Sequence, residues 1–248
     1  MIAAPAVVAE RLDGFVASTL GAAGDPGVAV VVVNSHGVVS CRGFGHDGDG
    51  NPVTCDTPFA LASLTKSVTA IAAMQLAESR SIELDAPVTR YLPWFAVMGP
   101  PAAGITVRDL LNQRSGFDTA SGLAYLAVPA SAKMTLEARV RALAAVRVGR
   151  PGERFQYSNA NYDVLGAIVE ARSGMAYQSY VRNRVLAPLG VTRVAFACDE
   201  PVRGYVRLFS IPVRAPRFPE LCADAPAGGL VMGAAQYGRY LAAHLDAG

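Results

Sequence analysis

The sequence predicts an α/β (α+β) domain in which an antiparallel sheet hairpin packs on helices and a helical lobe follows the hairpin. Two apolar segments near the start are joined by a short polar turn, which is typical of paired antiparallel strands. Later segments repeat their apolar residues at helical spacing between Gly and Pro breaks. With 248 residues, of which 52% are hydrophobic, the chain is long enough to bury a large core. We therefore expect one domain over residues 1–248, with the helical lobe at roughly 64–190.

The first three elements follow from the apolar pattern. "MIAAPAVVAERLDGFVASTLG" has the spacing of an amphipathic helix. "VAVVVV" (28–33) and "VVSCRGFG" (38–45) are predicted strands, because the "NSHG" between them is typical of a tight turn. The unbroken apolar run of the first strand predicts burial on both of its faces.

The later elements are predicted helices with recognisable ends. A helix is expected from about Ser63 to Glu78, where no Gly or Pro interrupts the chain after Leu64. Thr106 and Asp109 have capping-box spacing, and the helix they begin should stop at the pair Ser115 and Gly116. A further helix follows "QYSNANY" and ends at Gly174, and a last one closes "PAGGLVMGAAQYGRYLAAHLDAG". Residues 199–227 are rich in Pro and Arg. Within them, "RGYVRLFSIPVRAPRF" is predicted to form a solvated loop, and the alternative is that it borders a site for a substrate carboxylate.

Composition excludes several classes of function. The net charge is only +2, with no block of like charges, so we expect no nucleic acid partner. No window approaches the roughly 18 apolar residues of a spanning helix, so no membrane span is expected. The start lacks the basic region and long apolar region of a secretory signal, which predicts a cytoplasmic location.

The cysteine and histidine pattern predicts neither a metal site nor a cofactor. The four cysteines are Cys41, Cys55, Cys198 and Cys222, and none has C-x-x-C spacing. Only three histidines accompany them, none placed like a zinc ligand. We therefore expect plain buried or half-buried thiols.

The stretch "PFALASLTKSVTAIA" (58–72) carries the first candidate site. Ser63 and Lys66 are three residues apart at the start of a helix, so their side chains share one face. A serine hydroxyl becomes a good nucleophile when a neighbouring base takes its proton, and a neutral lysine can do so. The Ser63 backbone N–H at the helix start would be one oxyanion donor. The alternative is a serine cap beside a lysine that reaches solvent, although the apolar turns that follow are an unusual place for such a lysine.

The triplet Tyr157, Ser158, Asn159 is the second candidate. A tyrosine ahead of a helix can act as general base or acid if cations lower its pKa. Asn159 can donate to a substrate carbonyl. In the alternative interpretation Asn159 only caps the helix and Tyr157 only packs.

Six ordered segments together resemble one family. They are "FALASLTKSVTA", "LDAPVTRYLP", "ITVRDLLNQRSGF", "PGERFQYSNANYDVLG", "VLAPLGVTRVAF" and "PAGGLV". In this order they resemble the β-lactamase-related serine hydrolases, which include class C β-lactamases, D-alanyl-D-alanine carboxypeptidases and lactamase-like esterases.

The resemblance implies a β-lactamase/transpeptidase-like fold and a mechanism. By resemblance, Ser63 is the nucleophile, Lys66 and Tyr157 together transfer protons, and Asn159 binds the substrate amide. The implied reaction is hydrolysis of an ester or amide carbonyl, in a β-lactam, a D-Ala peptide or a small ester, through an acyl-enzyme on Ser63. Members of this family are often extracytoplasmic.

The sequence departs from the family pattern in one respect. Members carry a K-T-G or H-x-G triplet on a strand that follows the "PAGGLV" segment, and residues after 230 contain neither triplet. We therefore expect a sheet that is incomplete at the C-terminus, with an open apolar edge suited to self-association or to a strand from a partner. The alternative function is an impaired fragment or pseudoenzyme that serves as a binding or interaction module.

Overall fold

The computed structural model describes residues 5–23, 26–99, 104–120, 134–199, 202–209, 211–215 and 222–246. Its helices are α1 (Pro5–Ala23), α2 (Thr65–Glu78), α3 (Val107–Leu111), α5 (Leu136–Arg141), α6 (Asn159–Ser173), α7 (Tyr177–Tyr180), α8 (Ala225–Gly228) and α9 (Ala234–Asp246). Its strands are β1 (Gly27–Asn34), β2 (Gly37–Gly45), β3 (Phe59–Ala60), β4 (Ala195–Phe196), β5 (Tyr205–Leu208), β6 (Ile211–Arg214) and β7 (Leu230–Met232).

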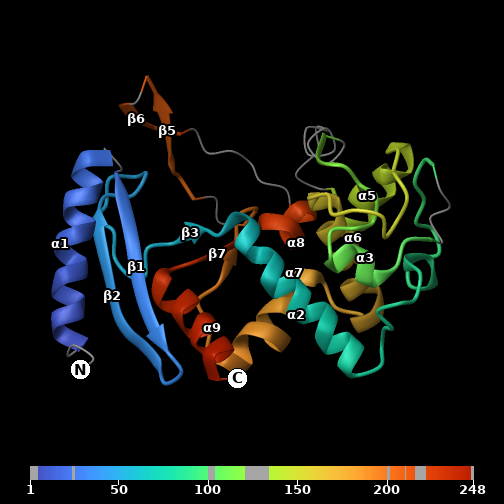
Figure 1. Cartoon of the computed structure of the whole chain (residues 1–248), viewed down its shortest axis with the longest axis horizontal. Coiled ribbons are helices and arrows are strands. Elements are labelled where there is room, and N and C mark those ends of the chain that lie inside the picture. Colours follow the sequence, from blue (N-terminus) through green and yellow to red (C-terminus); the bar gives the residue numbers. More distant parts are fainter. Residues whose placement is uncertain are drawn as a thin grey trace.

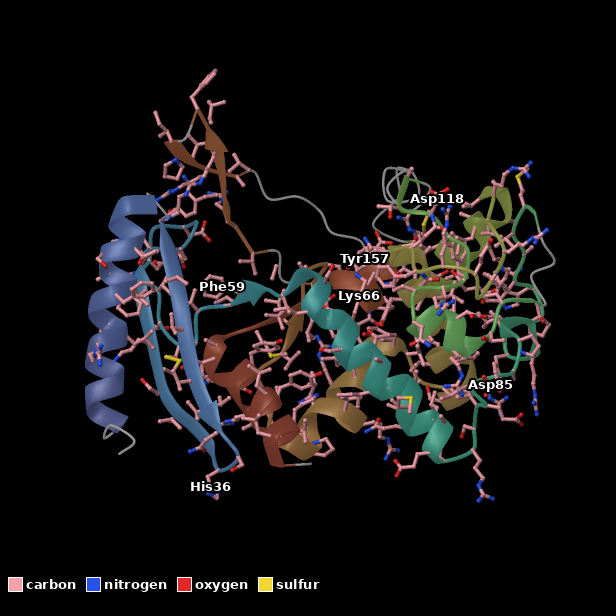
Figure 2. The ribbon with its side chains drawn as sticks, in the orientation of Figure 1. His36, Phe59, Lys66, Asp85, Asp118 and Tyr157 are labelled. Atoms are coloured by element: carbon pink, nitrogen blue, oxygen red, sulfur yellow. A yellow bond between two sulfur atoms is a disulfide. The ribbon has the colours of Figure 1, made fainter. Side chains whose placement is uncertain are left out.

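The predicted N-terminal hairpin is confirmed. Strands β1 and β2 pair antiparallel, and the hairpin lies between α1 and α9 (Figure 1). Gly238 lets α9 approach the hairpin closely, since a Cβ there would lie 2.6 Å from Cγ2 of Val31. The turn that carries His36 lies at the far end of the hairpin from Lys66 and Tyr157 (Figure 2). The prediction that both faces of the first strand are buried is wrong, because residues 27–33 are only half-buried.

Two further small sheets were not predicted. The short strands β3, β7 and β4 form one antiparallel sheet with β7 in the centre, near the middle of the molecule (Figure 1). Strands β5 and β6 form an exposed hairpin where a solvated loop was expected. Its cross-strand pairs Val206 with Val213 and Leu208 with Ile211 put apolar side chains on one face, which gives this segment strand periodicity.

The helical core is built around α6, in which residues 160–169 are all buried. Helices α2, α3, α5 and α7 pack against it. The predicted capping box is present, since the Thr106 hydroxyl accepts from the Asp109 N–H and the Asp109 carboxylate accepts from the Thr106 N–H. Gly174 ends α6 with φ 67°, as predicted.

Helix α3 ends at Leu111, four residues before the predicted stop at Ser115. The cause is local, because Gln113 has φ 57°, outside the right-handed helical region. The chain therefore turns away from the helix axis two residues after Leu111.

The described part of the chain has neither a membrane-spanning helix nor a cluster of metal-ligating side chains. No helix there combines the length and apolarity needed to cross a membrane. Within the same residues, no three His, Cys, Asp or Glu side chains gather as metal ligands would.

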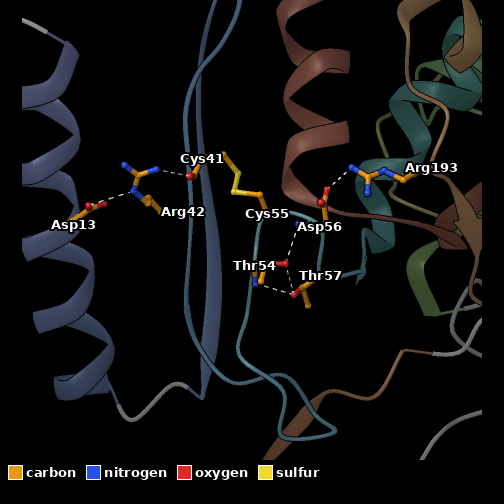
Figure 3. Close-up of a disulfide and its surroundings, with 8 residues drawn as sticks. All are labelled: Asp13, Cys41, Arg42, Thr54, Cys55, Asp56, Thr57 and Arg193. Carbon is orange, nitrogen blue, oxygen red and sulfur yellow. Dashed lines mark hydrogen bonds and ion pairs between the residues drawn. A yellow bond between two sulfur atoms is a disulfide. The ribbon is translucent and has the colours of Figure 1, made fainter.

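The prediction of free thiols is wrong, because Cys41 and Cys55 form a disulfide (Figure 3). Cys41 lies in β2, and the loop that follows β2 folds back until Cys55 is 5.9 Å away, Cα to Cα. Gly43 permits this return, since a Cβ there would lie 2.0 Å from the Val53 carbonyl oxygen. Cys198 is also disulfide-bonded, and no described cysteine is free.

The disulfide should stabilise the fold measurably. Because it closes a loop of 14 residues, we expect the double variant Cys41→Ala/Cys55→Ala to lose about 3 kcal/mol of unfolding free energy. Urea denaturation under non-reducing conditions measures this loss. Ser40→Ala, in the same strand, is the control and should stay near the wild type. An unchanged unfolding midpoint in the double variant would contradict the expectation.

Candidate active site

Ser63 lies in a single 3-10 turn, Ala62–Leu64, that runs directly into α2. The turn begins under strain, since Ala62 has φ 45° without being glycine. Leu230 of β7 holds both sides of the turn: its carbonyl accepts from the Leu61 N–H at 2.8 Å, and its N–H donates to the Thr65 hydroxyl at 3.1 Å. The strand thus fixes the Ser63 backbone, while the side chain is exposed.

Lys66 extends from the same face of α2, with only 7% of its surface exposed. Its Nζ donates to Ser63 Oγ at 3.1 Å, to Asn159 Oδ1 at 2.7 Å and to the Ala227 carbonyl at 2.6 Å. These three acceptors match the three N–H bonds of a lysine ammonium. The alternative interpretation, in which Lys66 reaches solvent, is therefore wrong.

Tyr157 approaches Ser63 from the loop before α6, as Figure 2 shows for its position beside Lys66. Its hydroxyl donates to Ser63 Oγ at 2.7 Å, and Lys66 Nζ lies 4.9 Å from the centre of its ring. Burial acts to raise the pKa of Tyr157, but the nearby charge of Lys66 and the hydrogen bond with Ser63 outweigh it. The net effect is a pKa below the ordinary tyrosine value.

Asn159 is the first residue of α6 and not its cap, a position held by Ser158. Its side-chain oxygen accepts from Lys66. The structure therefore brings all four predicted site residues together. They come from two distant segments, since Lys66 and Asn159 are 93 residues apart in the sequence.

The Ala227 carbonyl that binds Lys66 is held in place by buried hydrogen bonds. The Thr69 hydroxyl, one turn after Lys66, donates to the Pro226 carbonyl at 2.7 Å and lies 2.7 Å from the Tyr177 hydroxyl. Burial is the main cause that raises the pKa of Tyr177, so this phenol stays protonated and donates to Thr69. The chain of bonds runs from Tyr177 through Thr69 to α8.

Two other contacts fix α8. Gly166 of α6 leaves room for Pro226, since a Cβ there would lie 2.2 Å from the proline Cγ. At the start of α8, the fully buried guanidinium of Arg139 donates to the Asp224 carboxylate at 2.8 Å. Burial raises the pKa of Asp224, and Arg139 only partly offsets this. Helices α2, α5 and α6 thus all contribute to the position of the Ala227 carbonyl.

Sequence reasoning missed these supporting groups. Thr65 and Thr69 are four residues apart and share one face of the helix. Two buried hydroxyls within an apolar helix are a signal that could have identified them. The Ala227 carbonyl belongs to the main chain, which has no signature in the residue type.

The chain matches one family model and is similar to curated proteins. A family model described as "Beta-lactamase" matches residues 12–248. Esterase EstB of Burkholderia gladioli is 34% identical over 199 residues, which cover 74% of this chain and 49% of EstB. Protein flp of Staphylococcus aureus strain COL is 29% identical over 191 residues, 75% of this chain and 38% of that protein.

A solved structure gives the same picture for the fold. The octameric penicillin-binding protein homologue from Pyrococcus abyssi aligns with a TM-score of 0.79 and 29% identity, over 94% of this chain and 55% of that one. The similarity confirms the fold predicted from the sequence. The chain spans half or less of the length of the two curated relatives.

The hydrogen bonds beneath Lys66 lead to a stability prediction. Thr69→Val leaves the Pro226 carbonyl and the Tyr177 hydroxyl unpaired in the core, so we expect it to cost about 2 to 4 kcal/mol of unfolding free energy. Tyr177→Phe leaves the bond from Thr69 to Pro226 intact and should cost about 1 kcal/mol. Urea denaturation gives both values, with Thr69→Ser as the control that restores the hydroxyl. Equal losses for the valine and phenylalanine variants would refute the proposed direction of the bonds.

Proposed function

Because the chain belongs to the β-lactamase family, we propose that it is a serine hydrolase that forms an acyl-enzyme on Ser63. One observation carries the proposal: Ser63 Oγ is within hydrogen-bond reach of both Lys66 Nζ and the Tyr157 hydroxyl. A nucleophile in contact with a proton acceptor and a fixed cation is the arrangement that acyl transfer requires. The proposed substrates are small molecules with an ester or amide carbonyl, including β-lactams and D-Ala peptides.

In this mechanism Tyr157 is the general base. The lowered pKa of its phenol favours the phenolate. The three acceptors around Lys66 Nζ favour the ammonium form, which has no lone pair with which to accept a proton. Lys66 therefore acts as the cation that stabilises the phenolate. This division of roles differs from the simplest sequence-based hypothesis, in which the lysine takes the serine proton.

Tyr157 moves the protons in both halves of the proposed reaction. The Tyr157 phenolate takes the Ser63 proton as Oγ bonds to the carbonyl carbon, and Tyr157 then passes that proton to the leaving alcohol or amine. Water next attacks the acyl carbon, with the Tyr157 phenolate accepting its proton. Tyr157 then passes that proton to Ser63 Oγ as the bond between Oγ and the acyl carbon breaks and the acid leaves. The Ser63 N–H, in the 3-10 turn that leads into α2, is the proposed oxyanion donor.

Asn159 is proposed to bind the substrate. Its Oδ1 accepts from Lys66, which fixes the orientation of the carboxamide. The Nδ2 group is then left as a donor for a substrate carbonyl. This role combines positioning of the lysine with recognition of the amide or ester.

A second proposal concerns the open edge of the first sheet. Among the described strands, β1 pairs only with β2, and a hollow of about 450 Å³ lies beside its first residues, lined in part by β3 and β5. We propose that an extended strand from elsewhere pairs with this edge. The interaction-module alternative uses the same edge without catalysis.

The disulfide between Cys41 and Cys55 indicates the cellular compartment in which the chain works. A bond between Cys41 and Cys55 persists in oxidising compartments and is rare in the cytosol. We therefore propose that the chain works outside the cytoplasm, in place of the cytoplasmic location predicted from its first residues.

Covalent labelling tests the nucleophile. After incubation with a fluorophosphonate, we expect the intact mass of the wild type to rise by one adduct, and Ser63→Ala to show no gain. Ser67→Ala, four residues on in the same helix, is the control and should label normally. Parallel incubations with a β-lactam and with a p-nitrophenyl ester separate the substrate classes. A folded wild type that gains no mass with any probe would favour the interaction module.

The pKa of Tyr157 gives a pH prediction. Below this pKa the phenol is protonated and cannot take the Ser63 proton, so acylation should speed up as pH rises through it. Because the pKa is lowered, the inflection should lie below the usual value of about 10. Rates of acylation by a p-nitrophenyl ester, followed against pH, measure it. Tyr157→Phe should remove the inflection, and an unchanged profile in that variant would exclude Tyr157 as the base.

A further inference from the structure

Gln113 is a buried residue beside the candidate site that the proposed mechanism does not use. It follows α3, is only 5% exposed, and has φ 57°, in the left-handed region where side chains are strained. A strained non-glycine residue persists where its surroundings hold it in place, and such residues cluster at functional sites.

Gln113 forms hydrogen bonds to the residues on both sides of Tyr157 in the sequence. Its main-chain carbonyl accepts from the Gln156 N–H at 2.8 Å, and its side-chain Oε1 accepts from the Ser158 N–H at 2.9 Å. One residue thus holds the backbone immediately before and immediately after Tyr157. The Tyr157 carbonyl is also held, by the Thr119 hydroxyl at 2.9 Å.

The orientation of the Gln113 carboxamide is itself fixed. Oε1 accepts a second bond, from Asn161 Nδ2 at 2.6 Å, and the Asn161 oxygen accepts in turn from the Ser115 hydroxyl. Asn161 and Ser115 are both buried. The oxygen of Gln113 therefore has to face the Tyr157 segment.

The same orientation leaves the other end of the side chain unsatisfied. Nε2 of Gln113 is buried and has no hydrogen-bond partner among the described residues. An unpaired buried donor is unfavourable, as is the left-handed backbone. Two unfavourable features at one residue indicate that its position is set by something other than the stability of the loop.

We propose that Gln113 is a positioning residue, which holds the Tyr157 phenol against Ser63 by anchoring the backbone on both sides of the tyrosine. The proposal rests on the proposed function, because it assigns Tyr157 a role in acylation. Tyr157 is 39% exposed, so few side chains enclose it, and its backbone anchors act together with Ser63 and Lys66 to set where the hydroxyl lies. A small displacement of a catalytic group has a large effect on rate.

Two variants test this positioning. Gln113→Asn tolerates the left-handed backbone but is one methylene too short to reach the Ser158 N–H, so it removes the second anchor while keeping the fold. Gln113→Glu keeps an oxygen in the place of Oε1. We expect the asparagine variant to lower the rate of Ser63 labelling by a fluorophosphonate about 10-fold to 100-fold, with the pH inflection moved upward. The glutamate variant should stay within about 3-fold of the wild type at pH values where its carboxylate accepts both bonds.

A control separates positioning from stability. Thr106→Ala removes the cap of α3, in the same region, without contact to Tyr157. It should lower the melting temperature but leave the pH inflection in place. If Gln113→Asn and Thr106→Ala both lower the melting temperature and neither changes the inflection, Gln113 is structural only and the proposal is overturned.

A second readout does not depend on activity. In protein labelled with carbon-13 at the tyrosine Cζ, the NMR titration of Tyr157, assigned with Tyr157→Phe, reports its contact with Lys66 and Ser63. We expect its midpoint to rise in Gln113→Asn. If the wild type does not label at Ser63, the proposed function fails, and a raised midpoint still supports the positioning. Identical titrations in the wild type and Gln113→Asn overturn the inference, even if labelling succeeds.

Discussion

The Lys66 ammonium is the interaction on which the rest of the site depends. A charged amine with 7% exposure is costly to desolvate unless every N–H bond finds an acceptor. Here the acceptors come from the 3-10 turn, the start of α6 and the end of α8. Since these segments are distant in sequence, one buried charge constrains how three parts of the core meet. Arginine offers a planar fork in place of three diverging donors and does not fit this geometry.

Two of the four non-glycine residues with a positive φ in the described part of the chain belong to the candidate site. Ala62, just before Ser63, and Gln113, bonded to the Tyr157 segment, both have left-handed backbones without being glycine. The surrounding helices supply the stability that holds them, through a nearly fully buried α6 and the contacts of α2 with it. The two segments that present the hydroxyls of Ser63 and Tyr157 are thereby hydrogen-bonded through their backbones, while both side chains remain open to solvent.

Sequence reasoning succeeded where the signal was local. The capping box at Thr106, the glycine stop at Gly174 and the spacing of Ser63 and Lys66 are each contained within a few residues. It failed where partners are distant: the bond between Cys41 and Cys55 depends on the return of a loop, and β7 depends on pairing with β3 and β4. The proposed choice of Tyr157 over Lys66 as the base was equally hidden from the sequence, because it rests on a third acceptor for Lys66 that belongs to the main chain.

The scarcity of lysine has a chemical consequence. Lys66 and Lys133 are the only lysines among 248 residues, so nearly every amine-directed reaction on a side chain occurs at one of two places. In the folded chain the Lys66 amine is buried and fully hydrogen-bonded, and acetylation or reductive methylation must wait for the site to open. The extent of modification in a single peptide therefore records how often the site opens. Lys66 is therefore a natural reporter of local opening at the candidate active site.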